Sequence, residues 1–231
     1  MIFFVYKYIF IYLYICIFIY ILVLLIQIIK YTMAKIILFT HQKGGVGKST
    51  LSFNVANLLN QHAKVGLIDW DYQGTLLQVR ELNDQLTFID VDRDVKKIPH
   101  ADFDFIIIDT PPYIFEEIHA LVKLANLIVI PTQASINDLL AIDKTVQIIK
   151  ENDAVDRSII VFNRIKSNSS LKEKLTENFN ELQIPIANSI INDYDAITNS
   201  IVTKGVEVKH KANNQLQNLT TELITKLLSN G

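Results

Sequence analysis

The sequence predicts an α/β fold in which helices cover both faces of a doubly wound, mostly parallel sheet. Short and almost purely apolar runs recur at residues 36–39, 105–108 and 127–130. Strands that are buried on both faces of a parallel sheet have such continuous apolar runs. Glycines, acidic residues or other polar residues follow these runs. The ends of the runs would form the carboxyl edge of the sheet, where ligands of open α/β sheets bind. A length of 231 residues is enough for one such domain.

The elements are expected to alternate between strand and helix after residue 33. Strands are predicted at 35–40, at the runs that end in Asp69 and Asp109, and at 87–91, 127–132, 158–164 and 186–191. Helices are predicted at 48–62, 116–125, 136–152, 170–180, 194–204 and 213–228. Residues 76–84 are expected to form a short helix or a loop, and the charged segment 92–100 to be exposed. The last helix has one apolar stripe, which we expect to pack on the sheet rather than bind a membrane.

Residues 1–32 differ in composition from the rest of the chain. Residues 9–29 are almost purely apolar, and about 20 apolar residues in a helix span a bilayer core. The stretch has no glycine or alanine, which spanning helices usually use for packing, and Met33 stands shortly before the first predicted strand. We therefore expect one domain at residues 33–231 that starts at Met33, with residues 1–32 as translated upstream sequence. The alternative is a transmembrane helix that anchors the chain through residues 9–29.

Composition excludes some classes of protein. The single cysteine, Cys16, rules out a disulfide framework and a cysteine-ligated iron–sulfur cluster. The formal net charge of −2 gives no global sign of nucleic-acid binding, so any contact with DNA has to come from a local basic patch. The mildly clustered basic residues that are candidates for such a patch are Arg164, Lys166, Lys204, Lys209 and Lys211. The alternative is an ordinary solvated surface.

A glycine-rich loop at residues 41–50 lies between an apolar run and a helical segment, which is the setting that a phosphate-binding loop requires. Its glycines let the backbone curl closely around a polyphosphate, and the following helix directs backbone N–H groups at the anion. Lys48 is expected to neutralise the β- and γ-phosphates, and the Ser49 hydroxyl to hold Mg²⁺. Nucleotide contacts are expected from the whole loop: Lys43, Gly44, Gly45, Val46, Gly47, Lys48, Ser49 and Thr50.

The loop departs from the usual phosphate-binding pattern, because Gln42 replaces the first glycine and Lys43 follows it. The string from Lys43 to Thr50 resembles the deviant Walker A box of the ParA/MinD family of P-loop ATPases. In that family the early lysine reaches across a dimer interface to the partner's nucleotide. The resemblance covers essentially all of residues 33–231. It implies a homodimer that forms on ATP binding, with Lys43 coupling the two events.

Two acidic motifs at strand ends agree with this resemblance. Asp69 and Asp71 lie in a string similar to the family's D-x-D-P-Q-G box, from which Tyr72 departs. By resemblance Asp71 is tied to ATP hydrolysis and Asp69 belongs to the Mg²⁺ site; the alternative is a pair of solvated aspartates that cap the next helix. Asp109 ends an apolar strand in a Walker B pattern, and it is expected to hold Mg²⁺ through water or through the Ser49 hydroxyl.

Two further residues are assigned to the nucleotide by resemblance. Asn163 stands at the strand end where the family has an adenine-contacting Asn, and its amide offers the donor and the acceptor that an adenine edge requires. The alternative is an Asn that caps a turn. Pro131 lies in a segment that resembles the family's D-x-v-l-i-P-t pattern, and it is expected to contact the nucleotide as well.

The resemblance implies an ATPase that partitions a plasmid or chromosome, in the cytoplasm and associated with the nucleoid. ATP and Mg²⁺ would lock the dimer, which would bind DNA non-specifically until a ParB-like, DNA-bound partner stimulates hydrolysis. Lys43, Lys48 and Asp71 are the expected catalytic residues. The alternatives are a MinD-like membrane-associated positioning ATPase, a metabolic ATP-dependent synthetase of the same superfamily, and a non-enzymatic nucleotide-binding module. A bacterial tyrosine kinase is disfavoured, because no tyrosine cluster follows Tyr194.

Overall fold

The computed structural model describes residues 12–24, 33–71, 74, 76, 78, 80–82, 85–98, 102–133, 135–166, 179 and 181–229. The predicted helix at 170–180, apart from Phe179, lies outside the described residues, as does Tyr72.

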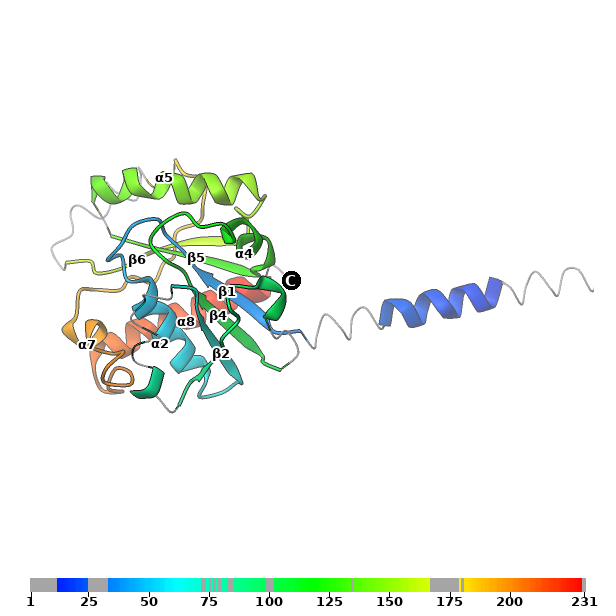
Figure 1. Ribbon diagram of the computed structural model, residues 1–231, viewed down its shortest axis with the longest axis horizontal. Coiled ribbons are helices and arrows are strands. Elements are labelled where there is room, and N and C mark those ends of the chain that lie inside the picture. The colour runs from blue at the N-terminus through cyan, green and yellow to red at the C-terminus, as the bar shows by residue number, and fades with distance from the viewer. Residues whose placement is uncertain are drawn as a thin grey trace, which may run out of the picture.

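Six strands form one sheet in which every pairing is parallel, as predicted. The strands are β1 (Lys35–Phe39), β2 (Val65–Asp69), β3 (Thr87–Phe88), β4 (Phe105–Asp109), β5 (Leu127–Thr132) and β6 (Ser158–Phe162). Their order is β3-β2-β4-β1-β5-β6, so the chain fills one side of β1 first and the other side afterwards (Figure 1). Ligand sites of doubly wound sheets lie at the carboxyl edge where this reversal occurs.

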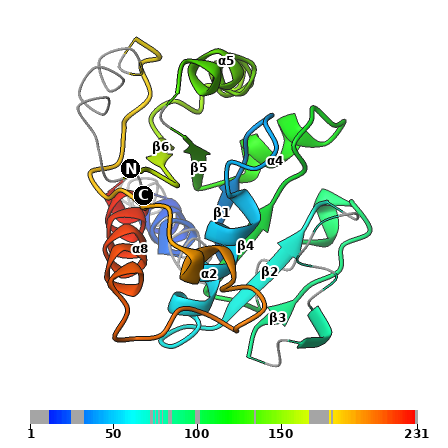
Figure 2. The ribbon, with the colours of Figure 1, turned by 90° about the vertical axis from the view of Figure 1, so that its left-hand side faces the viewer.

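Helices cover both faces of the sheet (Figure 2). The α-helices are α2 (Lys48–Leu59), α4 (Ile118–Leu124), α5 (Ile136–Glu151), α7 (Asp195–Thr198) and α8 (Lys211–Ser229), and the 3-10 helices are η1 (Arg80–Leu82) and η2 (Val95–Lys97). One buried apolar cluster joins α4 and α5 to the sheet, and a second joins α2 and α8 to its opposite face. The predicted α/β fold with helices on both faces is thereby confirmed.

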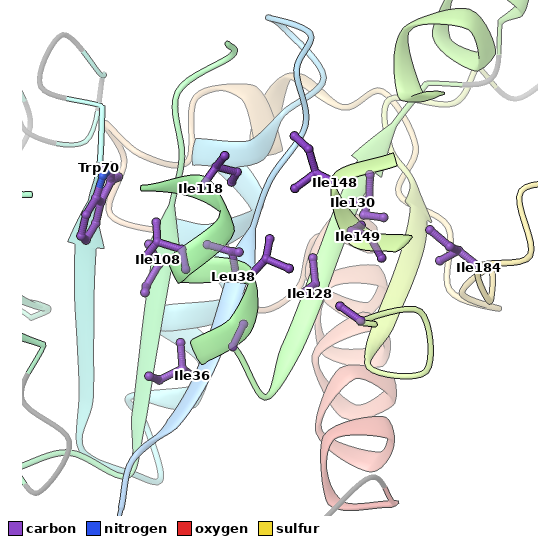
Figure 3. Close-up of a cluster of buried hydrophobic side chains, with 14 of the residues drawn as sticks. Ile36, Leu38, Trp70, Ile108, Ile118, Ile128, Ile130, Ile148, Ile149 and Ile184 are labelled. Atoms are coloured by element: carbon purple, nitrogen blue, oxygen red, sulfur yellow. The ribbon is translucent and has the colours of Figure 1, made fainter. Parts of the chain in front are cut away.

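The two clusters arise because successive side chains of a strand point to opposite faces. On β1, Ile36 and Leu38 belong to the cluster under α4 and α5, whereas Ile37 and Phe39 belong to the other. Figure 3 shows the first cluster, in which Ile36 and Leu38 lie with isoleucines from neighbouring strands and from the covering helices. The second cluster contains the predicted apolar stripe of α8: Leu216, Leu219, Leu223 and Leu227 are buried in it, and Ile224 is partly buried against it. The prediction that this stripe packs on the sheet is confirmed.

Several predicted elements are shorter in the structure. The strand predicted at 87–91 is reduced to β3 at Thr87–Phe88, and the helix predicted at 48–62 ends at Leu59. The segment predicted at 186–191 does not form a regular strand, and the parallel bridges there join Ile160 with Ile186 and Ile165 with the following Asn192. The backbone N–H groups of residues 188 and 189 donate to the Glu222 carboxylate of α8 at 2.7 and 2.8 Å, which takes them out of the ladder. The helix predicted at 194–204 ends at Thr198 and continues as turns, which reach left-handed φ values of 59° and 122° at residues 204 and 205.

Residues 12–24 form a helix that packs on nothing in the described part of the chain. Its large apolar side chains are between 39% and 74% exposed. Among the described residues, no helix is both long enough and apolar enough to cross a membrane. The two interpretations of residues 1–32 stay predictions.

Candidate functional site

The loop between β1 and α2 requires glycine at two positions. Gly45 and Gly47 have φ values of 77° and 94°, in the left-handed region that favours glycine. A Cβ on Gly47 would lie 2.1 Å from Nδ2 of Asn163, so a side chain here would also collide with β6's end. Gly47 is the N-cap of α2, and no side-chain hydrogen bond caps the helix there. The first N–H groups of the helix are therefore left to bind an anion at the loop.

As predicted, the structure brings Ser49, in the first turn of α2, together with Asp109 at the end of β4. Ser49 Oγ donates to Asp109 Oδ2 at 2.5 Å. Asp109 is buried, and burial raises its pKa to about 8 even though the hydrogen bond from Ser49 opposes that rise. The other carboxylate oxygen, Oδ1, is buried and has no hydrogen-bond partner in the described part of the chain. This carboxyl is therefore unfavourably placed until a cation or donor reaches it.

The oxygens of Ser49 and Asp109 fit Mg²⁺, which prefers hard oxygen ligands and usually completes its shell with phosphates and water. The described residues contain no group of three or more His, Cys, Asp or Glu side chains that could hold a metal. Asp69 makes a contact that the sequence did not predict. Its Oδ1 accepts the backbone N–H of Asp71 at 2.9 Å, so it holds the turn that carries Asp71, and its contact with Mg²⁺ stays a prediction.

An open cleft of about 390 Å³ lies over the loop, within the size range of small-molecule sites, about 300–1,000 Å³. It is lined by Gly44, Gly45, Gly47, Lys48, Ser49, Thr50, Asp71, Gly74, Thr110, Pro112, Asn163, Arg164, Ile197, Thr198 and Ile201. The phosphate loop, the ends of β2 and β4 and the segment around α7 thus meet at one place. The three motifs identified in the sequence converge on this cleft, whereas its wall near α7 was not predicted.

Lys48 is almost completely buried at the floor of the cleft, at 6% exposure. Its Nζ donates to the carbonyl oxygen of Lys43 at 3.3 Å. Burial lowers the pKa of Lys48, and the negative charges of Asp109 and Asp71 oppose that effect. A buried cation facing two carboxylates at a sheet edge is suited to bind an anion that brings its own metal.

Asn163 and Pro131 differ in how well they fit their predicted roles. Asn163 lines the cleft, donates from Nδ2 to the carbonyl oxygen of Val46 at 2.9 Å, and has a buried Oδ1 without a partner among the described residues. It holds the loop, and its contact with adenine stays a prediction. Pro131 lies inside β5 opposite Val161 and is absent from the cleft lining. Proline is tolerated there because β1 pairs with β5 only as far as Val129.

Lys43 points away from the cleft and pairs with its own chain. Its Nζ lies 2.5 Å from Oδ1 of Asp138 at the start of α5. Asp138 is 1% exposed and also accepts a hydrogen bond from the Ser135 hydroxyl, whose oxygen in turn accepts the Asp138 backbone N–H. Sequence analysis missed Asp138, although Ser-x-x-Asp at a helix start is a capping-box pattern. The role of Lys43 across a dimer interface stays a prediction.

Arg164 lines the cleft, which the sequence did not predict. Its Nε lies 3.1 Å from Asp193 Oδ1, and its Nη1 donates to the carbonyl oxygen of Gly45 at 3.5 Å. Arg164 is also exposed, as are the other four DNA-binding candidates, Lys166, Lys204, Lys209 and Lys211. Their contact with DNA stays a prediction.

Two curated proteins are similar to this chain in sequence. The chain is 26% identical over 179 residues to the maintenance of carboxysome distribution protein A of Halothiobacillus neapolitanus, covering 72% of this chain and 82% of that protein. It is 24% identical over 204 residues to a ParA family protein of Mycoplasma pneumoniae, covering 62% and 75%.

Solved structures share the fold. A putative plasmid partition protein of Borrelia burgdorferi bound to AMPPNP matches with a TM-score of 0.66 at 18% identity, covering 84% of this chain and 99% of that one. The MinD cell division protein of Aquifex aeolicus matches with a TM-score of 0.68 at 19% identity, covering 83% and 98%. The family model described as the CobQ/CobB/MinD/ParA nucleotide binding domain matches residues 37–204. The chain therefore belongs to the CobQ/CobB/MinD/ParA family of nucleotide-binding domains.

Proposed function

We propose that this chain is a Mg²⁺-dependent ATPase that works as an ATP-driven dimer switch in DNA partitioning. One observation carries the proposal. Lys48, Ser49 and Asp71 line one cleft, the buried Asp109 accepts the hydroxyl of Ser49, and Lys43 is held on the same loop by a buried carboxylate of α5. This is the set of groups that phosphoryl transfer needs, because its catalysis consists of positioning and charge stabilisation.

Each group has a defined part in hydrolysis. The N–H groups of the loop and the start of α2 cradle the phosphates, and Lys48 neutralises their charge. Ser49 and Asp109 would hold Mg²⁺, which would supply charge stabilisation for phosphoryl transfer. Asp71 lines the cleft and orients the attacking water. No protein nucleophile is required. Unstimulated turnover is slow, on the order of 10⁻⁴ to 10⁻² s⁻¹, as in NTPase switches that await a stimulator.

Lys43 connects the nucleotide to dimerisation. In the single chain its ammonium is neutralised by Asp138, and 35% of its side chain is exposed, so exchange for another anion needs no unfolding. A second subunit's nucleotide phosphates are such an anion. The ATP-bound dimer then presents two copies of the exposed lysines 166, 204, 209 and 211 to DNA, and a DNA-bound partner protein stimulates hydrolysis and release. Contacts of this kind are independent of sequence and sensitive to salt.

A second cargo is favoured by one specific observation. The alignment with the carboxysome distribution protein covers 82% of that protein's length. The second candidate function is therefore the same ATP-driven switch acting on a protein cargo instead of DNA. Loss of a plasmid or chromosome after gene deletion supports the first candidate. Faithful inheritance of DNA with a mislocalised protein assembly supports the second.

The test of the switch is DNA binding by the full chain with ATP, with ADP, and with Lys43→Ala plus ATP, at several salt concentrations. We expect binding only with ATP, a steep decline with salt, and loss in Lys43→Ala. Lys123→Ala is the matched control, because Lys123 is an exposed lysine of α4 outside the cleft. Binding that is equal with ATP and ADP, or that survives in Lys43→Ala, contradicts the switch. ATP-dependent binding to lipid vesicles, or turnover that only a metabolite accelerates, would favour the MinD-like or the synthetase alternative.

A further inference from the structure

His41 lies between β1 and the phosphate-binding loop, and the function proposed above makes no use of it. Its side chain is fully buried, with 0% exposure. Its Nδ1 accepts the backbone N–H of Lys43 at 2.9 Å. A ring nitrogen that accepts a hydrogen bond carries no proton, so the proton is on Nε2 and the imidazole is neutral. Nε2 has no hydrogen-bond partner in the described part of the chain, so Nδ1 makes the one polar contact of this ring that the structure shows.

The hydrogen bond from Lys43 belongs to a set of contacts that fixes the entry of the loop. The carbonyl oxygen of the same Lys43 accepts Lys48 Nζ at 3.3 Å, so the peptide groups of this residue connect the imidazole to the phosphate-binding ammonium. The Lys43 side chain is held by Asp138, and the backbone N–H of Gln42 donates to Thr145 Oγ1 of α5 at 3.2 Å. The bond between residues 41 and 43 has the form of an Asx turn, in which a side-chain acceptor holds the N–H two residues on.

We propose that His41 is a positioning residue of the phosphate-binding loop, which as a neutral acceptor at Nδ1 fixes the backbone of Lys43 and through it the place of the Lys48 ammonium. The inference rests on the proposed function in one respect, since it takes the ligand to be a nucleoside diphosphate or triphosphate. Without an acceptor at this position, the Lys43 N–H is left partly buried and unpaired, and the loop relaxes to satisfy it.

The electrostatic surroundings keep His41 in the form that this role needs. Burial is the largest effect, and together with the charges of Lys48 on α2 and Lys43 on the loop it lowers the pKa of His41 to about 4, against the opposing charge of Asp138 on α5. The imidazole is therefore neutral through the physiological range. Only below about pH 5 would protonation place a donor opposite the Lys43 N–H and a positive charge beside two lysines.

Two substitutions of similar polarity separate positioning from packing. His41→Asn places an amide oxygen where Nδ1 lies, whereas His41→Gln places its polar atoms near Nε2 and leaves Nδ1 without a replacement. The measurement is ADP binding to the full chain in Mg²⁺, by calorimetry at pH 7.5, with urea unfolding of each variant as the control for folding. We expect His41→Gln to weaken ADP binding about tenfold and His41→Asn to stay within about twofold of the wild type. Equal affinities of the two variants would overturn the proposal.

A nucleotide-independent measurement tests the hydrogen bond itself. In ¹⁵N NMR of the imidazoles, the His41 signal is the one of the five histidines that disappears in both variants. It should report an unprotonated, accepting Nδ1 and a protonated Nε2 from pH 8 down to about pH 5. A protonated Nδ1 at pH 7 would overturn the proposal. A wild type that shows this NMR signature and binds no ADP would instead remove the proposed function.

Discussion

Asp109→Asn is expected to stabilise the nucleotide-free protein while it removes Mg²⁺-dependent nucleotide binding. The Asp109 carboxyl is completely buried, and its Oδ1 has no hydrogen-bond partner among the described residues. Asparagine has nearly the same shape, it keeps an oxygen that accepts the Ser49 hydroxyl, and it carries no charge to desolvate. The substitution therefore removes the electrostatic cost of this site and leaves its packing in place.

The magnitude follows from proton linkage. Burial raises the Asp109 pKa from 3.8 to about 8 in the folded chain, so at pH 7 the unfolded chain is ionised here while the folded chain holds a proton. A group whose pKa is raised on folding stabilises the fold most at pH values below its unfolded pKa, and this stability is lost as pH rises toward the folded pKa. Each pH unit in this window lowers the free energy of unfolding by about 1.4 kcal/mol as the pH rises. The loss between pH 4 and pH 7 is on the order of 4 kcal/mol.

The assay is urea unfolding of the wild type and Asp109→Asn in EDTA between pH 4.5 and pH 8. We expect the variant to be more stable at pH 8, with a gain that shrinks steadily toward pH 4.5. Addition of Mg²⁺ and ADP at a hundred times the dissociation constant should stabilise the wild type by about 2.7 kcal/mol and the variant by much less. A variant that is less stable than the wild type by the same amount at every pH would refute the reasoning, because the carboxyl would then be a net stabilising group.

Three further predictions concern the loop, α5 and the core. Gly47→Ala should abolish nucleotide binding in an ADP titration, because its Cβ would collide with Asn163. A Cβ on Gly45 would meet nothing within 4 Å, so Gly45→Ala should weaken ADP binding by only about 1 kcal/mol, the cost of a left-handed φ in alanine. Equal losses of ADP affinity in the two variants would contradict this. Asp138→Asn should lower the free energy of unfolding by about 1–3 kcal/mol, and an unchanged urea midpoint would show that the Lys43 contact contributes nothing. Leu219→Ala should cost about 2–5 kcal/mol in the same assay, because Leu219 of α8 is fully buried in the cluster that joins α8 to the sheet. A loss below about 1 kcal/mol would mean that α8 packs loosely on the sheet.

Much of the fold was predictable because its strands are short and continuously apolar. β1 and β5 have nearly the predicted ends, since each apolar run is followed directly by polar residues. The segment 186–191 is also mostly apolar, but Asn188 and Ser189 interrupt it, and Glu222 from a helix 33 or 34 residues away accepts the backbone N–H groups of these two residues. The segment forms only isolated bridges. Apolar patterning reports burial, but it does not report which hydrogen-bond partner a backbone group finds.

The sequence by itself determined the phosphate-binding loop, its glycines and the helix that follows, because these features lie within one continuous stretch and depend on local backbone conformation. Only the tertiary structure decided which distant groups meet that loop. Asp109 reaches Ser49 across 60 residues, Asp138 reaches Lys43 across 95, and Asn163 reaches Val46 across 117. Such contacts follow from the strand order, which is set by the burial of two apolar faces at once, and a single buried polar contact leaves no periodicity in the sequence.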